Sequence, residues 1–145
     1  MIPSEEDLQI RDVARQFAQE RLKPFAAEWD REHRFPAEAL KEMADLGFLG
    51  MLVAEEWGGA QTGHLAYAMA LEEIAAGDGA CSTIMSVHNS VGCMPIAKFG
   101  SEEQKRQFLV PLARGEMIGA FALTDPEAGS DASFLKTRAR RDGDH

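Results

Sequence analysis

The sequence predicts a mostly α-helical protein, in which an all-α domain over residues 1–115 precedes the first strands of an incomplete β-domain over residues 116–145. Apolar residues recur at three- and four-residue steps through most of the first 115 residues, which is typical of amphipathic helices. Glycine or proline separates the periodic segments. After Gly115 the pattern changes to a short apolar run and then to alternating residues, which indicates strands.

Composition narrows the classes of function. The chain has 145 residues and a net charge of -9, with a pI near 4.9, which argues against nucleic acid as the main partner. No run approaches about 18 apolar residues, so we expect no membrane-spanning helix. Two cysteines do not make a disulfide framework, and we expect Cys81 and Cys93 to be small buried groups. The histidines and cysteines show no metal-ligand spacing, so no metal site is expected.

The first helix is expected to begin after Ser4, a favourable N-cap residue, with Asp7 placed to complete an approximate capping box. Its apolar face continues as far as Trp29. Pro24 lies inside this pattern and should kink or divide the helix, because proline lacks the backbone N–H.

Four shorter helices should follow, separated by glycine-containing breaks. A capping box is also visible where the last of them begins, at Ser101 and Gln104. The apolar connector over residues 48–53 is expected to be extended, and residues 58–63 form a glycine-rich loop. The four helices are predicted over Pro36–Leu46, His64–Ala76, Ala80–Phe99 and Ser101–Gly115.

The predicted helix over Ala80–Phe99 is apolar nearly all round, so it should be central. Ser86, His88, Asn89 and Ser90 are the exceptions in its middle. They are either core polar groups with satisfied hydrogen bonds or the wall of a ligand cavity.

Strands are predicted at residues 118–123 and 135–139, with a loop over residues 124–131 between them. Thr124 and Ser130 supply hydroxyl groups, and Gly129 would let a bound group approach the backbone closely. Taken alone, such a loop is an ordinary surface turn or a ligand-binding loop on a rigid support.

The sequence resembles the acyl-CoA dehydrogenase family of flavoproteins. The decapeptide ALTDPEAGSD, at residues 122–131, is similar to the flavin-loop signature of that family, and further motifs follow the family order. The resemblance covers the whole chain but only the N-terminal up-and-down helical domain and the start of the middle β-domain. Asp125 stands where the family usually has Glu, and Glu127 and Phe134 also depart from its pattern. The supporting motifs are Phe35-Pro36, Glu55–Ala60, Glu72–Ala75, His88–Ser90 and Phe99–Lys105.

This resemblance implies an FAD-dependent oxidoreductase that introduces a trans-2 double bond into an acyl-CoA thioester. The central helix is most similar to short- or branched-chain acyl members. The implied FAD contacts are Phe121, Ala122, Leu123, Thr124, Gly129 and Ser130. The implied acyl-CoA contacts are Ser130, Thr83, Val87 and Val91.

The resemblance implies that the catalytic base is a Glu of a C-terminal helical domain, so no catalytic residue is expected in this chain. Glu72 and Glu73 are expected to be surface or inter-helix charges. We therefore expect the chain to be a piece of a longer enzyme. The family also implies electron-transfer flavoprotein as partner, a homotetramer, and a cytoplasmic location in bacteria or the mitochondrial matrix in eukaryotes, with the cytoplasm preferred.

Two alternatives remain from the sequence. An acyl-CoA oxidase-like flavoenzyme would share the loop, and a helical interaction domain without a cofactor would use Gly129 and Ser130 only as turn residues. As a piece of a longer enzyme, the chain has helices whose packing partners are missing, so it should expose apolar surface and tend to associate.

Overall fold

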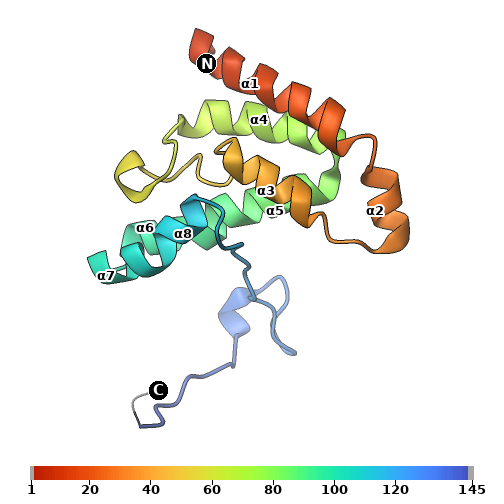
Figure 1. The fold of residues 1–145 in the computed structure, drawn as a ribbon. Helices are drawn as coiled ribbons and strands as arrows, with labels where there is room; N and C mark the ends of the chain where they lie inside the picture. The colour runs from red at the N-terminus through yellow and green to blue at the C-terminus, as the bar shows by residue number, and fades with distance from the viewer. Residues whose placement is uncertain (1, 144–145) are drawn as a thin grey trace.

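The computed structural model describes residues 2–143, in which helices occupy the chain as far as Ala113 and an extended segment follows (Figure 1). No helix of this described part is both long and apolar enough to cross a bilayer. The α-helices are α1 Glu5–Phe17, α2 Ala26–Glu32, α3 Ala37–Asp45, α4 Gly63–Gly77, α5 Gly79–Val87, α6 Met94–Phe99, α7 Glu102–Gln104 and α8 Val110–Ala113. The π-helical segments are η1 Ala18–Leu22, η3 His88–Cys93 and η4 Lys105–Leu109, and the 3-10 turns are η2 Glu55–Trp57 and η5 Ala132–Phe134.

The first helix begins and divides as predicted. The Ser4 hydroxyl accepts a hydrogen bond from the Asp7 backbone N–H at 3.1 Å, and the Ser4 N–H donates to the Asp7 carboxylate at 2.8 Å, which completes the capping box. The helix passes from α1 into η1, turns at residues 23–25 around Pro24, and resumes as α2. The missing N–H of proline explains the division at this point.

The main core lies between α1, α3, α4 and α5, and α1 runs beside α4 (Figure 1). Gly77 permits this close packing, because a Cβ there would lie 2.9 Å from both the Cβ and the carbonyl oxygen of Ala18. The core side chains are almost fully removed from solvent, which supplies most of the stability of such a domain. They include Ala14, Phe17, Leu22, Leu40, Met43, Phe48, Met51, Ile74, Cys81 and Met85.

The predicted central helix is confirmed as one continuous helical stretch, α5–η3–α6. Asp78 caps its start, because the Asp78 carboxylate accepts a hydrogen bond from the Cys81 N–H at 2.6 Å. The middle of this stretch is the π-helical segment η3, which precedes Pro95. Proline has no backbone N–H to donate to the carbonyl four residues earlier, so the α-helical hydrogen-bond pattern is interrupted here. The capping box at Ser101 is also present, with bonds of 2.8 and 3.2 Å to Gln104.

The connector over residues 48–53 is a series of turns rather than the extended segment that we predicted. Its backbone bonds are local or reach the next loop, as where the Ala60 N–H donates to the Gly50 carbonyl at 2.9 Å. Val53 packs into a second core cluster with Cys93, Leu109 and Leu112. The apolar run is therefore explained by burial and not by strand formation.

The strands predicted at residues 118–123 and 135–139 are not formed within residues 2–143, where the sole bridge is an isolated one between Asp125 and Ala128. The reason is that a strand needs a neighbour for its backbone groups, and the described residues offer these two segments none. Residues 144 and 145 of the predicted β unit lie outside the described residues.

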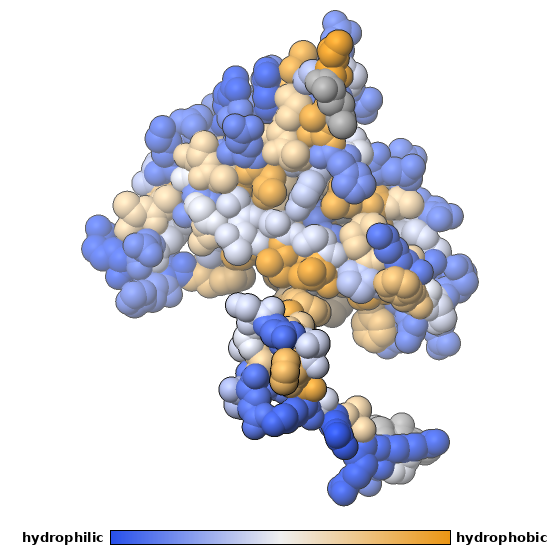
Figure 2. Space-filling view, turned by 180° about the vertical axis from the view of Figure 1, so that it is seen from behind, coloured by the Kyte–Doolittle hydropathy of each residue, from blue (hydrophilic) through white to orange (hydrophobic). Residues whose placement is uncertain are grey.

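Large apolar side chains are exposed, as the sequence predicts. Phe99, Phe134 and Phe121 have exposed fractions of 85%, 63% and 53%. Figure 2 shows hydrophobic residues gathered on the helical body close to where the extended segment leaves it. This surface is available for contact with other protein.

We therefore expect the isolated chain to associate as its concentration rises, because association removes this apolar surface from water. Light scattering at increasing concentration, with a dye that binds apolar surface, measures the effect. A monodisperse monomer at high concentration that binds no dye would contradict this expectation.

Candidate functional site

The loop over residues 121–130 lies on the extended segment, away from the helical body (Figure 1). The six residues assigned to cofactor binding, Phe121 to Thr124 with Gly129 and Ser130, are all exposed. Ala128 is the exception in the loop, with an exposed fraction of 2%. The structure thus presents the predicted residues on one surface loop whose turn is locally ordered.

Asp125 orders this turn. One carboxylate oxygen, Oδ1, accepts from the Glu127 N–H at 3.0 Å, and Oδ2 accepts from the N–H groups of Lys136 and Thr137 at 2.9 and 3.2 Å. The Thr137 hydroxyl donates to the same oxygen at 3.2 Å. Asp125 therefore ties the start of the loop to residues eleven and twelve positions later. The sequence signal for this role was an Asp before Pro126 in a turn-rich segment, where Asp side chains commonly bond nearby backbone.

The bond from the Lys136 N–H, with those from Thr137, lowers the pKa of Asp125. Because the folded value lies below the unfolded value, the closing bonds should persist above about pH 4 and be lost as the pH falls through the lowered pKa.

Replacement of Asp125 by Ala should open the loop. Alanine has no side-chain oxygen to accept the three bonds that Oδ2 now receives. Hydrogen exchange at the amides of Lys136 and Thr137 should then become faster. Asp131→Ala is the matched control, because the Asp131 carboxylate bonds only Ser133 in the described structure. Unchanged exchange in Asp125→Ala would show that Asp125 does not close the loop.

The loop has features that suit a flat, partly apolar cofactor. A Cβ at Gly129 would meet nothing within 4 Å, so the backbone there is open to a bound group. Phe121 and Leu123 expose apolar side chains, and Thr124 and Ser130 present hydroxyl groups. These residues fit the flavin contacts that the sequence resemblance implies.

The residues assigned to acyl-CoA binding on the central helix lie at four-residue spacing. Thr83 and Val91 are exposed and Val87 is half-buried. Thr83 and Val87 line a hollow of about 430 Å³ whose other walls come from α4 and α5. Val91 and Ser130 do not line this hollow, so the structure brings together two of the four residues.

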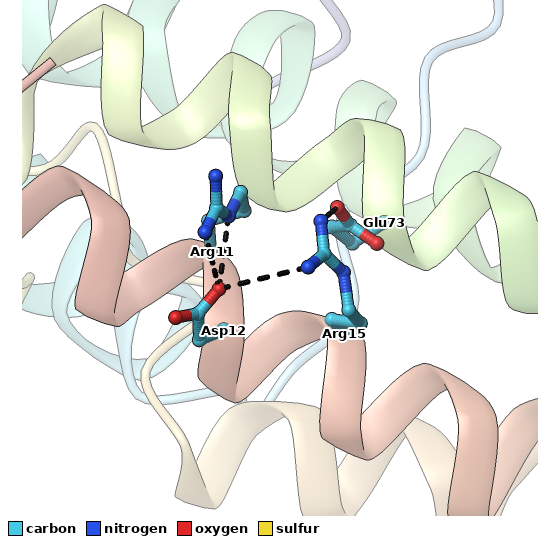
Figure 3. Close-up of polar contacts among 4 residues, drawn as sticks. All are labelled: Arg11, Asp12, Arg15 and Glu73. Atoms are coloured by element: carbon cyan, nitrogen blue, oxygen red, sulfur yellow. Dashed lines mark hydrogen bonds and ion pairs between the residues drawn. The ribbon is translucent and has the colours of Figure 1, made fainter.

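Glu73 is an inter-helix charge, as predicted, and not a free base. Its carboxylate accepts from the Arg15 guanidinium at 2.6 Å, which joins α4 to α1 and lowers the pKa of Glu73 (Figure 3). Arg15 also lies 3.9 Å from Asp12, which pairs with Arg11. Glu72 is exposed on α4 and lines the hollow at Thr83.

The polar residues His88 and Asn89 are fully buried, which supports their interpretation as core groups. The Asn89 amide donates to the carbonyls of Phe48 and Met85 at 2.9 and 3.0 Å. His88 contacts backbone groups of Leu112 and Gly119. The sequence pattern singles out these residues but not their partners Phe48, Leu112 and Gly119, which lie on distant parts of the chain.

Cys81 and Cys93 are both buried, as predicted, and they form no disulfide with each other. Burial raises the pKa of Cys81 to about 12 and that of Cys93 to about 11, so neither forms a nucleophilic thiolate at neutral pH. In the described residues, His, Cys, Asp and Glu form no group of three that suits a metal ion.

Comparison with known proteins yields consistent matches. The model of the acyl-CoA dehydrogenase N-terminal domain matches residues 4–116. The chain is 49% identical over 135 residues to the mitochondrial short-chain specific acyl-CoA dehydrogenase of Bos taurus, a match that covers 93% of this chain and 33% of that protein. The chain thus spans about a third of the length of the curated relatives it matches.

Solved structures agree with this match. One is a chain in the structure of the electron transferring flavoprotein of Acidaminococcus fermentans, with a TM-score of 0.94 and 38% identity over 99% of this chain and 38% of that chain. Another is a glutaryl-CoA dehydrogenase from Mycobacterium smegmatis in complex with FADH2, with a TM-score of 0.91 and 40% identity over 97% of this chain and 36% of that chain.

Proposed function

The chain belongs to the acyl-CoA dehydrogenase family, and on that premise we propose that it forms the N-terminal part of an FAD-dependent enzyme that converts an acyl-CoA thioester into its trans-2-enoyl-CoA. The similarity to a short-chain specific relative supports a short or branched acyl group as substrate.

One observation carries this proposal: the ALTDPEAGSD segment follows directly on the matched helical domain and forms an exposed loop closed by Asp125. A turn without a ligand role does not need an open backbone at Gly129 beside exposed apolar and hydroxyl side chains. The combination of loop and helical domain is more specific than either alone.

FAD would be held by the loop, and when bound it would accept the β hydrogen of the substrate as hydride. Phe121 and Leu123 would cover its apolar surface. The backbone of Leu123 and Thr124 would face its polar edge, where N–H dipoles stabilise developing negative charge. Gly129 and Ser130 would complete the contact.

The acyl-CoA would be bordered by the exposed face of the central helix, with Thr83 and Val87 at the hollow and Val91 one turn further. Ser130 would contact both the thioester's CoA portion and the cofactor. As the family resemblance implies, the base that removes the α proton would be a Glu from outside residues 1–145. Glu73 does not take this role, because its carboxylate is engaged by Arg15.

The proposal extends to the assembly. Residues 116–145 would begin a β-domain, and the exposed apolar residues would be covered by the rest of a homotetramer. Similarity to a chain in an electron transferring flavoprotein structure supports that class of acceptor. Mitochondrial and bacterial relatives support the matrix in a eukaryote or the cytoplasm in a bacterium, with the cytoplasm preferred.

The test uses the full-length protein that contains this chain. Anaerobic addition of butyryl-CoA should bleach its flavin absorbance, and turnover should require electron-transfer flavoprotein. Rapid turnover with dioxygen alone would instead indicate an oxidase. A protein that neither carries nor takes up FAD would favour a helical interaction domain.

A further inference from the structure

His88 lies where the helical body meets the extended segment. It is the first residue of η3, its exposed fraction is 0%, and its two ring nitrogens both have backbone partners. Nδ1 accepts from the Gly119 N–H at 3.0 Å, and Nε2 lies 3.0 Å from the Leu112 carbonyl oxygen.

These two contacts determine the tautomer. A backbone N–H can only donate, so Nδ1 must be the unprotonated nitrogen and accept from Gly119. The proton is then on Nε2, which donates to the Leu112 carbonyl. Burial lowers the pKa of His88, and hydrogen bonds with backbone groups of Leu112 and Leu49 raise it by a smaller amount. The imidazole is therefore neutral at neutral pH.

The two partners lie on either side of the turn that ends α8. Leu112 is in α8, and its carbonyl also accepts from the Gly115 N–H at 2.9 Å as the helix ends. Gly119 lies at the start of the extended segment. His88 therefore bonds both the end of α8 and the start of the extended segment.

Gly119 is also the last anchor of that segment. Beyond it, the hydrogen bonds of the described residues 120–143 all remain within residues 125–143. Gly119 lies beside η3 and α8, since a Cβ on it would be in ordinary van der Waals contact with the Gly92 Cα at 3.4 Å and the Leu112 side chain at 3.5 Å. In the described residues, the His88 bond is therefore the last hydrogen bond that joins the segment to the helical body.

We propose that His88 is a positioning residue that sets where residues 119–131 leave the helical domain, and thereby where the loop meets the flavin. The second part rests on the proposed function, whereas the first part concerns this chain alone. Proteins exploit such buried polar bonds to specify one arrangement, because an apolar contact has no preferred direction.

The first test uses the unmodified chain. Labelled with 15N, it should show a coupling across the hydrogen bond between the Gly119 amide nitrogen and His88 Nδ1. Absence of the coupling, with a protonated Nδ1, would overturn the proposal without requiring any variant to fold.

The second test separates positioning from packing. Asn places an amide oxygen near the position of Nδ1 and Gln places an amide nitrogen near that of Nε2. His88→Asn should therefore retain the Gly119 bond, whereas His88→Gln should lose it and raise hydrogen exchange at the Gly119 amide about tenfold, the factor expected for one hydrogen bond. His64→Gln is the control, because His64 is exposed on α4. Equal Gly119 exchange in the Asn and Gln variants would mean that His88 only fills space.

In the full-length protein, His88→Gln should weaken FAD binding more than His88→Asn. An unmodified protein that takes up no FAD would refute the proposed function, while the Gly119 measurements would still decide whether His88 positions the segment. Equal FAD affinity in both variants, with different Gly119 exchange, would overturn the link from His88 to the cofactor.

Discussion

Replacement of Gly59 by alanine is expected to destabilise the helical domain by about 3 kcal/mol, the upper end of the usual cost of overpacking. An added Cβ would overlap the Val53 carbonyl oxygen and lie 2.5 Å from both the carbonyl carbon and the Cβ of Val53. These atoms cannot move aside, since Val53 packs in the second core cluster and its carbonyl accepts from the Gln61 N–H at 3.0 Å. Urea unfolding followed by circular dichroism measures the loss.

Gly79→Ala is the matched control. A Cβ at Gly79 meets nothing within 4 Å, and alanine favours the helix that begins there. The control should retain or slightly increase stability. If Gly59→Ala unfolds at the same urea concentration as Gly79→Ala, the close approach of Gly59 to Val53 is not as the structure describes it.

Replacement of Asn89 by leucine is expected to cost about 3 kcal/mol, although the leucine side chain is apolar and similar in size. The Asn89 amide nitrogen donates to the Phe48 carbonyl at 2.9 Å, and its oxygen lies 3.4 Å from the Leu52 nitrogen. Leucine would leave these backbone groups without that partner, and each buried unpaired group costs about 1–3 kcal/mol. Thermal or urea unfolding provides the measurement.

Ser90→Ala controls for the loss of a polar group from η3. Ser90 donates at 2.6 Å to the Ser86 carbonyl of its own helix and is half-buried, so its removal should cost much less. Similar losses in both variants would show that Asn89 does not connect the central helix to the turns after α3.

The helical domain could be predicted because its signals are local. The capping boxes at Ser4 and Ser101, the break at Pro24 and the uniformly apolar helix around Met85 all follow from short-range periodicity and backbone chemistry. The connector at residues 48–53 was predicted wrongly because an apolar run is compatible with a strand or with buried turns.

The candidate site could be predicted only in part. The residues of the loop were identified by resemblance to a family. The bonds that close it could not be predicted, because the N–H groups that donate to Asp125 belong to Lys136 and Thr137, eleven and twelve residues later. The partnership of His88 with Gly119 is equally non-local. The strands predicted at 118–123, from a short apolar run, and at 135–139, from period-two alternation, are not formed in the described residues. Both patterns indicate strand geometry, but neither supplies the neighbouring strand.

The central claim is that the loop at residues 121–130 binds FAD, and flavin titration of the full-length protein with and without Gly129→Ala tests it most directly. In this chain a Cβ at Gly129 meets no atom within 4 Å, so the substitution should leave the unfolding midpoint unchanged. The unmodified protein should bind FAD, and Gly129→Ala should bind it about tenfold more weakly, a change of about 1.4 kcal/mol, because the added methyl group occupies space that the cofactor needs. Equal FAD affinity in the two proteins, or no binding by the unmodified protein, would contradict the account.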